Sequence, residues 1–426
     1  MADREAPPRD LTRFVLPEIG FLEETGNPYE PYRLVDPAGV VVEPVAVWFS
    51  ELQAQAKPAS TVRSYGMDLL RWFRFLWAFE VPWERASRVD ARDFVRWMQV
   101  ADKPVRVHWR YTAKGITAAP NPIGRTMLAP GTPNPVTGKP TPGVKYAAST
   151  RAHAETVVRC FYDFHAEEGT GPLLNPFPLD RSRRDGRAHA HRNPREPFAA
   201  ERQGRYRPRV ARRVPRRIPD ALFDAVFAAL KYDRDRALLS SWVSTGARAE
   251  ELLSSGQRDA DPGQQLITVE RKGTRERQPL PAAADTFVWL RLYQEDAWRA
   301  GVPRGGSWPL WWTLRRPWRP LKYHAARAML MRAQTLLGSN WTLHDLRHTA
   351  AYRMARDPEL PLTHVQWVLN HAHLSTTQIY VAAGLEEIVE ELLAHHARRA
   401  ARPARQAPPA AGYNPASLDV LFGRPS

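Results

Sequence analysis

The sequence predicts a mainly α-helical protein with a small antiparallel β element, built as an all-helical domain followed by an α+β domain. Two observations carry this prediction. Apolar residues recur at helical spacing within residues 44–178 and again from residue 218 to about residue 400, whereas only residues 266–269 and 277–280 have β character. With 43% hydrophobic residues and 15 Trp among 426 residues, the chain can bury a substantial core.

Residues 44–178 are expected to form the all-helical domain. The first strong helix signal begins at Ser60, a candidate N-cap that precedes a run of apolar residues at helical spacing. A second, shorter helix is capped by Asp90, and a third begins at Ser149 or Thr150. The third helix carries the only cysteine, which we interpret as a core residue.

Three segments lie outside these helical patterns. Residues 101–147 contain eight Pro and five Gly, which indicates a long loop or an insertion in the helical domain. Residues 1–43 are Pro-rich and weakly patterned, so we assign no structure to this N-terminal arm. Residues 401–426 are rich in Pro and Ala and are expected to form a flexible tail.

Residues 179–217 are expected to link the two domains. From residue 181 to residue 217 there are 14 Arg and three acidic residues, a net charge of +11, with several Pro and no apolar periodicity. Such a segment is either a solvated tether or an arm that lies along DNA phosphates, and the motifs below favour DNA. The arginines expected to contact DNA are Arg205, Arg207, Arg209, Arg212, Arg213, Arg216 and Arg217.

The α+β domain is expected over residues 218–400. Its first helix is capped by Asp220, and its second runs from Asp235 to the Thr245–Gly246 pair. The two extended pieces form a hairpin around a basic turn. Helices resume at Asp285 and continue to about residue 399, with a break around residues 303–320.

Charge and composition exclude several classes of protein. Lys and Arg number 61 against 45 Asp and Glu, and the sequence pI is about 10.2, which favours a nucleic-acid partner. One cysteine allows neither an internal disulfide nor a thiolate-rich metal site. No apolar run approaches the roughly 18 residues of a membrane span, and the N-terminal sequence lacks the apolar region of a secretory signal. We therefore expect a cytoplasmic, nucleoid-associated protein.

Two segments of the second domain carry basic residues at turns. In TGARAEELL, Arg248 follows Gly246 at the start of a helix, where its planar guanidinium can bind a phosphate, and Glu251 can hold it from the next turn. In the hairpin, Lys272 lies at the tip beside Gly273. An ammonium on a flexible side chain is suited to protonating a leaving oxygen.

Two later segments carry acid–base groups. In LHDLRHTAA, His344 and Arg347 are three residues apart and share one helix face. In LNHAHLSTTQIYV, His371 precedes Tyr380 by nine residues. A tyrosine with a pKa of about 10 needs positive neighbours and a proton acceptor to act as a nucleophile. Each segment alone is more often structural, but the ordered set makes a self-consistent site for phosphoryl transfer.

These four segments resemble the signature motifs of the tyrosine recombinase (phage integrase) family, in order over residues 218–390. STVRSYGMDLLRWFRFL and STRAHAETVVRCFYDFH, within residues 44–178, are similar to the family's helical core-binding (SAM-like) domain. The resemblance implies an α+β catalytic domain that cuts and rejoins double-stranded DNA through a 3′-phosphotyrosyl intermediate. It implies no metal or nucleotide cofactor.

The resemblance assigns a role to each motif residue. Arg248 and Arg347 would clamp the scissile phosphate, and Tyr380 would attack the phosphorus. Lys272 would protonate the departing 5′ oxygen. His344 would be the general base and a phosphate ligand. His371 would donate a further hydrogen bond to the phosphate, and Glu251 would be the acidic residue that supports the first arginine.

The sequence departs from the family pattern at two positions within the motifs. Asn370 replaces the usual Gly, and because Asn tolerates the left-handed conformation we expect the turn to survive. Arg271 replaces the Gly that usually precedes the hairpin lysine.

The segment 385–393 is amphipathic. In the family such a helix packs on a neighbouring protomer, which predicts a tetramer on paired sites; packing within one chain is the alternative.

Several functions remain open at this level. The chain can be the integrase of a mobile element, acting with or without a directionality factor or a partner recombinase, or a transposase with the same chemistry. A chromosome-dimer resolvase is less compatible with the insertion and the basic linker. An inactive DNA-binding relative would be expected to lose Tyr380 or an arginine. A metal-dependent nuclease would need acidic ligands near the histidines, and resistance to EDTA distinguishes it.

Overall fold

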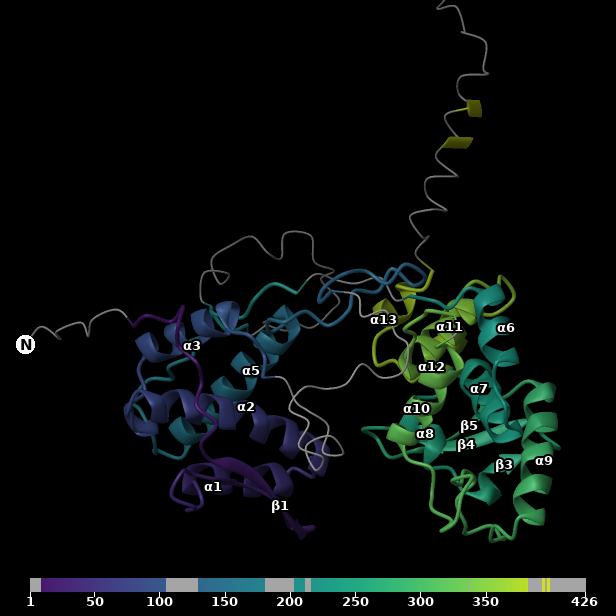
Figure 1. Cartoon of the computed structure of the whole chain (residues 1–426), viewed down its shortest axis with the longest axis horizontal. Helices are drawn as coiled ribbons and strands as arrows, with labels where there is room; N and C mark the ends of the chain where they lie inside the picture. Colours follow the sequence, from purple (N-terminus) through teal and green to yellow (C-terminus); the bar gives the residue numbers. More distant parts are fainter. Residues whose placement is uncertain are drawn as a thin grey trace, which may run out of the picture. The chain divides into compact units, whose positions relative to one another are not determined.

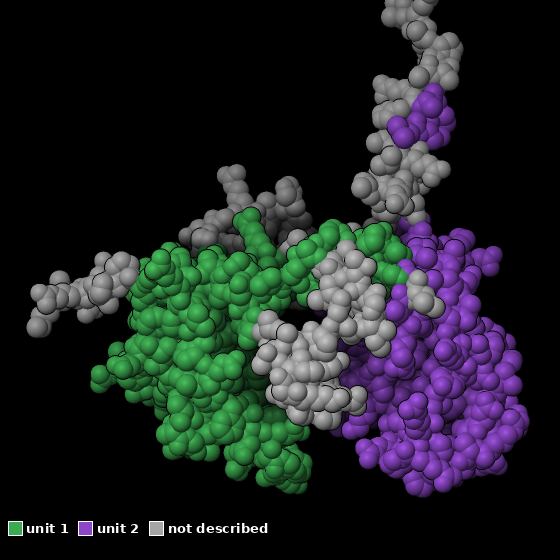
Figure 2. Space-filling view, in the orientation of Figure 1, with its two compact units in different colours: residues 1–213, 338–340 green, residues 214–337, 341–426 purple. Residues whose placement is uncertain are grey.

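The computed structural model describes residues 9–104, 129–180, 203–210, 216–335, 337–381, 393–394 and 397–398. The chain forms two compact units (Figure 2): unit 1 comprises residues 1–213 and 338–340, and unit 2 comprises residues 214–337 and 341–426. The predicted tail and most of the amphipathic segment 385–393 lie outside the described residues, as do Arg212 and Arg213.

The described part of unit 1 is helical, with one two-stranded sheet (Figure 1). Its elements are β1 (Phe21–Asn27), β2 (Glu30–Val35), α1 (Glu43–Ala54), α2 (Ala59–Ala78), the 3₁₀ helix η1 (Trp83–Arg85), α3 (Arg88–Val100) and α5 (Ala148–Glu167). The helices pack around an aromatic core in which the indole of Trp72 donates a hydrogen bond of 3.0 Å to the hydroxyl of Tyr162. That hydroxyl donates in turn to the carbonyl of Trp83, so this buried polar chain is satisfied.

The helices of unit 1 begin slightly differently from the sequence-based expectation. Helix α2 starts one residue before Ser60, and Pro58 occupies its N-cap position, so the prediction of a Ser60 cap was wrong. Helix α3 is capped by Ser87, and Asp90 is the third helical residue, which completes a capping box with the Ser87 backbone. The prediction of an Asp90 cap was therefore three residues late.

The N-terminal arm, residues 1–43, to which the sequence assigns no structure, contains the hairpin of unit 1. Strands β1 and β2 pair antiparallel, with Phe21 opposite Val35, and they pack on α2. Helix α2 accommodates the hairpin at Gly66, where a Cβ would lie 2.6 Å from a methyl of Leu22. The sequence contains no clear two-residue alternation here, which is why the hairpin was not predicted.

Part of the predicted linker packs on unit 1. Gly204 forms a bridge with Leu179, and Tyr206 joins the edge of the aromatic core. Arg207 donates to the hydroxyl of Thr156 at 2.6 Å. Residues 203–207 are thus anchored to α5 and its neighbours, so this part of the predicted linker is not a free tether.

Unit 2 is an α+β fold, as expected. Its described elements are α6 (Asp220–Ala228), α7 (Asp233–Thr245), α8 (Ala249–Leu253), η2 (Gln257–Asp259), β3 (Ala260–Asp261), β4 (Leu266–Glu270), β5 (Arg277–Pro281), α9 (Ala284–Arg299), α10 (Tyr323–Ala333), α11 (Leu343–Ala355), α12 (Leu362–Leu369) and α13 (Leu374–Gln378). The strands form one antiparallel sheet in the order β3-β4-β5, with Glu270 opposite Arg277.

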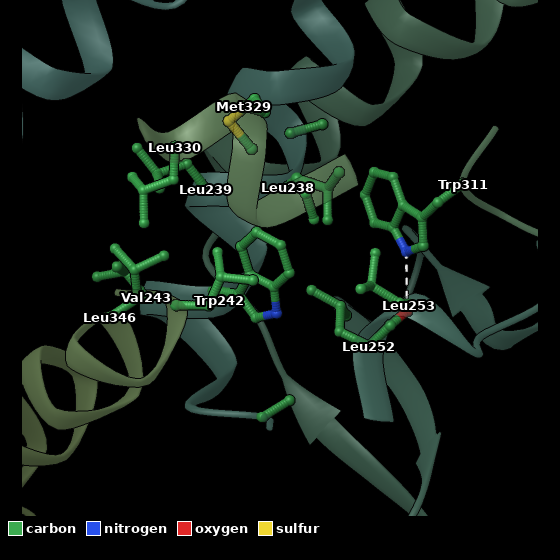
Figure 3. Close-up of a cluster of buried hydrophobic side chains, with 14 of the residues drawn as sticks. Leu238, Leu239, Trp242, Val243, Leu252, Leu253, Trp311, Met329, Leu330 and Leu346 are labelled. Atoms are coloured by element: carbon green, nitrogen blue, oxygen red, sulfur yellow. Dashed lines mark hydrogen bonds between the residues drawn. The ribbon is translucent and has the colours of Figure 1, made fainter. Parts of the chain in front are cut away.

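The core of unit 2 fixes the elements that carry the motif residues. Trp242 of α7 is fully buried among side chains of α8, α10 and α11 (Figure 3). The indole of Trp311 donates to the carbonyl of Leu252 at 2.9 Å, which anchors α8. Helix α7 contacts α8, α9 and α11, so the start of α8 and one face of α11 are held by a common support. Across the described residues, no helix has the length and apolar character needed to cross a membrane.

Candidate active site

Arg347 of α11 connects three of the four motif segments. Arg347 is 3% exposed, and its guanidinium donates to the carbonyl of Gly246 at 2.7 Å and to the carbonyl of Leu369. Gly246 ends α7 in the left-handed conformation, with φ of 64°, and Leu369 is the last residue of α12. The carbonyl ends of helices carry partial negative charge, so these two helix ends stabilise the buried cation.

Glu251 holds the first motif and the hairpin together. One carboxylate oxygen accepts from the Arg248 guanidinium at 2.8 Å and from the Lys272 amide at 3.1 Å. The other accepts from the Arg248 amide and from the guanidinium of Arg271, both at 3.0 Å. Burial alone would raise the pKa of Glu251, but these hydrogen bonds and the Arg248 charge lower it to about 2. Glu251 is therefore ionised at neutral pH.

Arg271, which the sequence presented only as a departure, is a central side chain of the site. Its side chain has no exposed surface. The guanidinium donates to Glu251, to the amide oxygen of Gln278 at 2.6 Å and to the carbonyl of Val368. It thereby joins the hairpin to α8 and to the end of α12. The signal available in the sequence was a long cation where a small residue is usual.

The site has more positive than negative charge. The guanidinium groups of Arg248, Arg271 and Arg347 surround the single carboxylate of Glu251. Burial and the nearby charge of Arg248 lower the pKa of Arg347 to about 10, so it remains protonated at neutral pH. Burial and the same cations lower the pKa of His371 to about 4. Such a cluster is suited to binding an anion with several oxygens, such as a phosphate.

The ring of His371 is fixed at both nitrogens. Its Nε2 lies 3.3 Å from a guanidinium nitrogen of Arg347, and its Nδ1 lies 2.9 Å from the hydroxyl of Thr377. Since guanidinium only donates, Nε2 accepts and Nδ1 carries the proton. Asn370, just before it, adopts φ of 48° at the end of α12, so the expectation that Asn would preserve this left-handed turn is confirmed.

Tyr380 lies directly beside this cluster. The residue is 6% exposed, and its side chain packs with Ala351, Val365 and Leu369. Its ring is stacked on that of His371, with centroids 6.2 Å apart. The hydroxyl lies 2.7 Å from Nδ1 of His348 on α11, a residue to which no role was given from the sequence.

The structure brings some of the predicted site residues into contact and leaves the side chains of others exposed. Arg248, Glu251, Arg347 and His371 share hydrogen bonds or close charges, and Tyr380 contacts them through its ring. Lys272 joins through its backbone amide, and its side chain is exposed. His344, also exposed, contacts the ring of His348 with centroids 4.3 Å apart.

The basic segment is only partly described. Arg205, Arg207 and Arg209 are exposed in unit 1, and Arg216 and Arg217 are exposed in unit 2. The guanidinium of Arg217 lies 4.3 Å from the ring centroid of Tyr352. Among the described residues, no group of three or more His, Cys, Asp or Glu side chains is placed to hold a metal ion.

Comparisons with known proteins find a family model and relatives that match part of this chain. The sequence model of the phage integrase family matches residues 219–387. Tyrosine recombinase XerC of Corynebacterium efficiens is 32% identical over 178 residues, which cover 39% of this chain and 52% of the relative. Tyrosine recombinase XerD of Pseudomonas putida is 30% identical over 173 residues, which cover 39% and 55%. The chain thus spans about half the length of the curated relatives it matches.

The fold also has a counterpart among solved structures. The XerH site-specific recombinase, in a post-cleavage complex with a palindromic difH substrate, aligns with a TM-score of 0.51 at 14% identity, covering 83% of this chain and 85% of that one. The fold is thus shared with a solved recombinase, and residues 219–387 match the phage integrase family model. This match confirms the resemblance to the tyrosine recombinases seen in the sequence.

Proposed function

We propose that this chain is a site-specific recombinase that cuts and rejoins DNA through a 3′-phosphotyrosyl intermediate. One observation carries the proposal. A buried tyrosine lies beside a cluster of arginines that a single carboxylate only partly neutralises. A phosphodiester supplies the missing negative charge and an electrophilic phosphorus for the tyrosine.

In the proposed reaction, Arg248 and Arg347 bind the non-bridging oxygens of the scissile phosphate. Their fixed positive charge stabilises the transition state, in which charge on those oxygens increases. His371 donates a further hydrogen bond once the phosphate is bound. Its pKa of about 4 is set partly by the nearby arginines, so an anion in the cluster raises it and favours the donor form.

Cleavage exchanges one phosphoester bond for another. The Tyr380 oxygen forms a bond to phosphorus while the bond from phosphorus to the 5′ oxygen breaks, and Lys272 protonates that oxygen. Rejoining is the reverse attack by a 5′ hydroxyl. Because bond energy is retained in the phosphotyrosine, the proposed exchange needs no metal or nucleotide cofactor.

We further propose that binding to double-stranded DNA involves both units. The exposed arginines of the basic segment neutralise phosphates, which contributes affinity without sequence readout. Helices of residues 44–178 and of the catalytic domain would read bases in the major groove. A tetramer on paired sites, formed through the segment 385–393, follows from the family resemblance. So does action on DNA in the bacterial cytoplasm.

The proposed biological role is integration or excision of a mobile element. A transposase with the same chemistry is the alternative, favoured by the Pro-rich insertion at residues 101–147. An inactive DNA-binding relative is disfavoured, because Arg248, Arg347 and Tyr380 are all present and Glu251 retains its partners.

Covalent trapping tests the chemistry directly. Purified protein is incubated in EDTA with end-labelled DNA from both flanks of its own gene and is then denatured in SDS. The proposal expects label attached to the wild-type protein and none attached to the Tyr380→Phe variant, with DNA binding retained. Mapping the break then identifies the crossover site.

Other outcomes of the trapping experiment have distinct meanings. Label that persists in Tyr380→Phe refutes the nucleophile assignment. Cleavage that EDTA abolishes supports the metal-dependent nuclease instead. Tight binding of a gene-flanking fragment with no covalent product, even on a nicked substrate that prevents rejoining, supports the inactive DNA-binding relative.

A further inference from the structure

The hydroxyl of Tyr380 has a nitrogen partner that the motif roles do not include. Tyr380 follows α13 and is held against α11 and α12 by Ala351, Val365 and Leu369. This packing places its hydroxyl 2.7 Å from Nδ1 of His348, within the range of a strong hydrogen bond.

A buried phenol needs such a partner to act as a nucleophile. Burial raises the pKa of Tyr380 above its ordinary value, and the charge of Arg347 offsets only part of this effect. Even at the ordinary phenol pKa of about 10, roughly one phenol in a thousand is ionised at pH 7, and burial lowers that fraction further in Tyr380. Attack at neutral pH therefore requires a base that removes the proton as the new bond forms.

We infer that His348 is this base: its Nδ1 takes the phenolic proton of Tyr380 during strand cleavage. The inference rests on the proposed function. As the Tyr380 oxygen bonds to phosphorus, its proton moves to Nδ1 and His348 becomes an imidazolium. The 5′ oxygen leaves with a proton from Lys272. On rejoining, His348 returns its proton to the departing Tyr380 oxygen and Lys272 recovers its own from the 5′ hydroxyl.

The other histidines of the site are less well placed for this step. His371 presents its ring face to Tyr380, at an interplanar angle of 12°, and both of its nitrogens point to other partners. His344, the base implied by the family resemblance, lies one helical turn before His348 and contacts its ring. It remains suitable as a phosphate ligand on the exposed side of α11.

Arginine and histidine side chains lie around the Tyr380–His348 pair. Among the described residues, they include Arg347 and His344 from α11, His371 from the turn after α12, and Arg248 beyond Arg347. A phosphate bound by these arginines places negative charge near His348 at the stage when it must accept a proton.

Single-turnover trapping on the crossover site, using the full chain, tests the base. His348→Asn keeps an amide near the position of Nδ1 but cannot accept a proton at neutral pH. At about pH 7 we expect this variant to form the covalent product about 10²–10⁴-fold more slowly than the wild type. The deficit should shrink as the pH rises toward the pKa of the phenol, because the phenol then ionises unaided. His364→Asn, an exposed histidine of α12, is the matched control and should react at the wild-type rate.

Three results would overturn the inference. A His348→Asn variant with the wild-type rate at pH 7 means that a hydrogen bond to Tyr380 is sufficient. A faster rate means that His348 restrains Tyr380 in an inactive position. A pH-dependent deficit found in His344→Asn and absent from His348→Asn assigns the base to His344.

A second measurement separates the inference from the proposed function because it needs no DNA. Nitrogen NMR of the histidine rings in the free protein should show His348 with its proton on Nε2 and a hydrogen-bonded Nδ1 that changes in Tyr380→Phe. A proton on Nδ1 would refute the base assignment. Absence of any Tyr380-dependent covalent product, together with the expected ring signals, would refute the proposed function and leave the pair itself established.

Discussion

The clusters around Asp68 and Asp90 in unit 1 bury charge in the opposite way from the cluster around Glu251 in unit 2. In the two clusters of unit 1, the buried groups are acids whose partners reach solvent. Asp68 is paired with Arg71 and with His153, whose side chain is 47% exposed, and Asp90 is paired with Arg9 at 2.6 Å. In unit 2 two of the bases, Arg271 and Arg347, are themselves buried.

The buried charges of unit 1 stabilise the fold, whereas those of unit 2 are proposed to bind a ligand. Asp90 completes a helix cap, and Asp68 links α2 to α5, so both clusters have a structural use. The second cluster buries cations beside one another, which opposes folding and is tolerated only because packing and helix ends hold them. The crowded cations fit the proposal that the remaining partner of this site is an external anion.

The largest contrast should appear when the central acid of each cluster is neutralised. Glu251→Gln leaves the fully buried Arg271 without its carboxylate, and we expect it to lower the free energy of unfolding by about 3–5 kcal/mol. Asp68→Asn should cost about 1 kcal/mol or less, because Arg71 and His153 can be solvated. Urea unfolding followed by circular dichroism measures both. Equal costs would show that the two clusters do not differ in kind.

The next contrast concerns Arg271 and the lysine beside it. Replacing Arg271 by Met removes one of the crowded cations but releases the hairpin from α8 and from the end of α12. We expect covalent trapping to fall about 10²-fold through misplacement of Lys272, while DNA binding persists. Arg33→Met, at a half-exposed arginine of β2 to which no DNA contact is assigned, should leave trapping nearly unchanged.

A DNA substrate with a sulfur leaving group shows whether Arg271 acts through Lys272. A 5′-bridging sulfur leaves without protonation, so it should rescue both Arg271→Met and Lys272→Ala. Rescue of Lys272→Ala alone would mean that Arg271 supports the phosphate-binding arginines and not the general acid. If neither variant is rescued, Lys272 does not protonate the leaving oxygen.

Much of the fold and the approximate site could be predicted from the sequence. Fold class, helix positions and the hairpin of unit 2 followed from local periodicity, and the order of the motif residues pointed to one site. The Ser87–Asp90 capping box was visible in the sequence, although the cap was assigned to the wrong residue. Local pattern explains these cases because each depends on residues a few positions apart.

The contacts that matter most chemically depend on tertiary packing instead. His348 meets Tyr380 across 32 residues, and Arg271 meets the carbonyl of Val368 across 97 residues. Neither pairing follows from spacing, because both require α11, α12 and the hairpin to converge. The hairpin of unit 1 was missed for a related reason: it is stabilised by packing on α2 more than by its own residue pattern.

A smaller contrast compares two glycines with nearly the same backbone. Gly169 in unit 1 has φ of 69° with open space around it, whereas Gly246 has φ of 64° and a Cβ there would lie 3.0 Å from Leu369. Alanine at either position should cost about 1–2 kcal/mol because of the left-handed conformation. Only Gly246→Ala should also slow covalent trapping, since it displaces the carbonyl bound by Arg347. A similar trapping rate in both variants would mean that this carbonyl does not position the guanidinium.

The smallest effect is a pH dependence of opposite sign in the two units. The hydrogen bond to Asp68 raises the pKa of His153, so its contribution to stability is present below about pH 6.5 and is lost as the pH rises through the raised value. Burial lowers the pKa of His371 to about 4, so the unfolded chain binds the extra proton between about pH 6.5 and 4, and stability falls as the pH falls.

Thermal unfolding of His153→Gln and His371→Gln at about pH 8 and pH 5 measures the contrast. Relative to the wild type, the first variant should lose stability on acidification and the second should gain it. Parallel shifts would mean that the cations around His371 do not control its protonation, and the case for an anion-binding site would then depend on Arg248 and Arg347 alone.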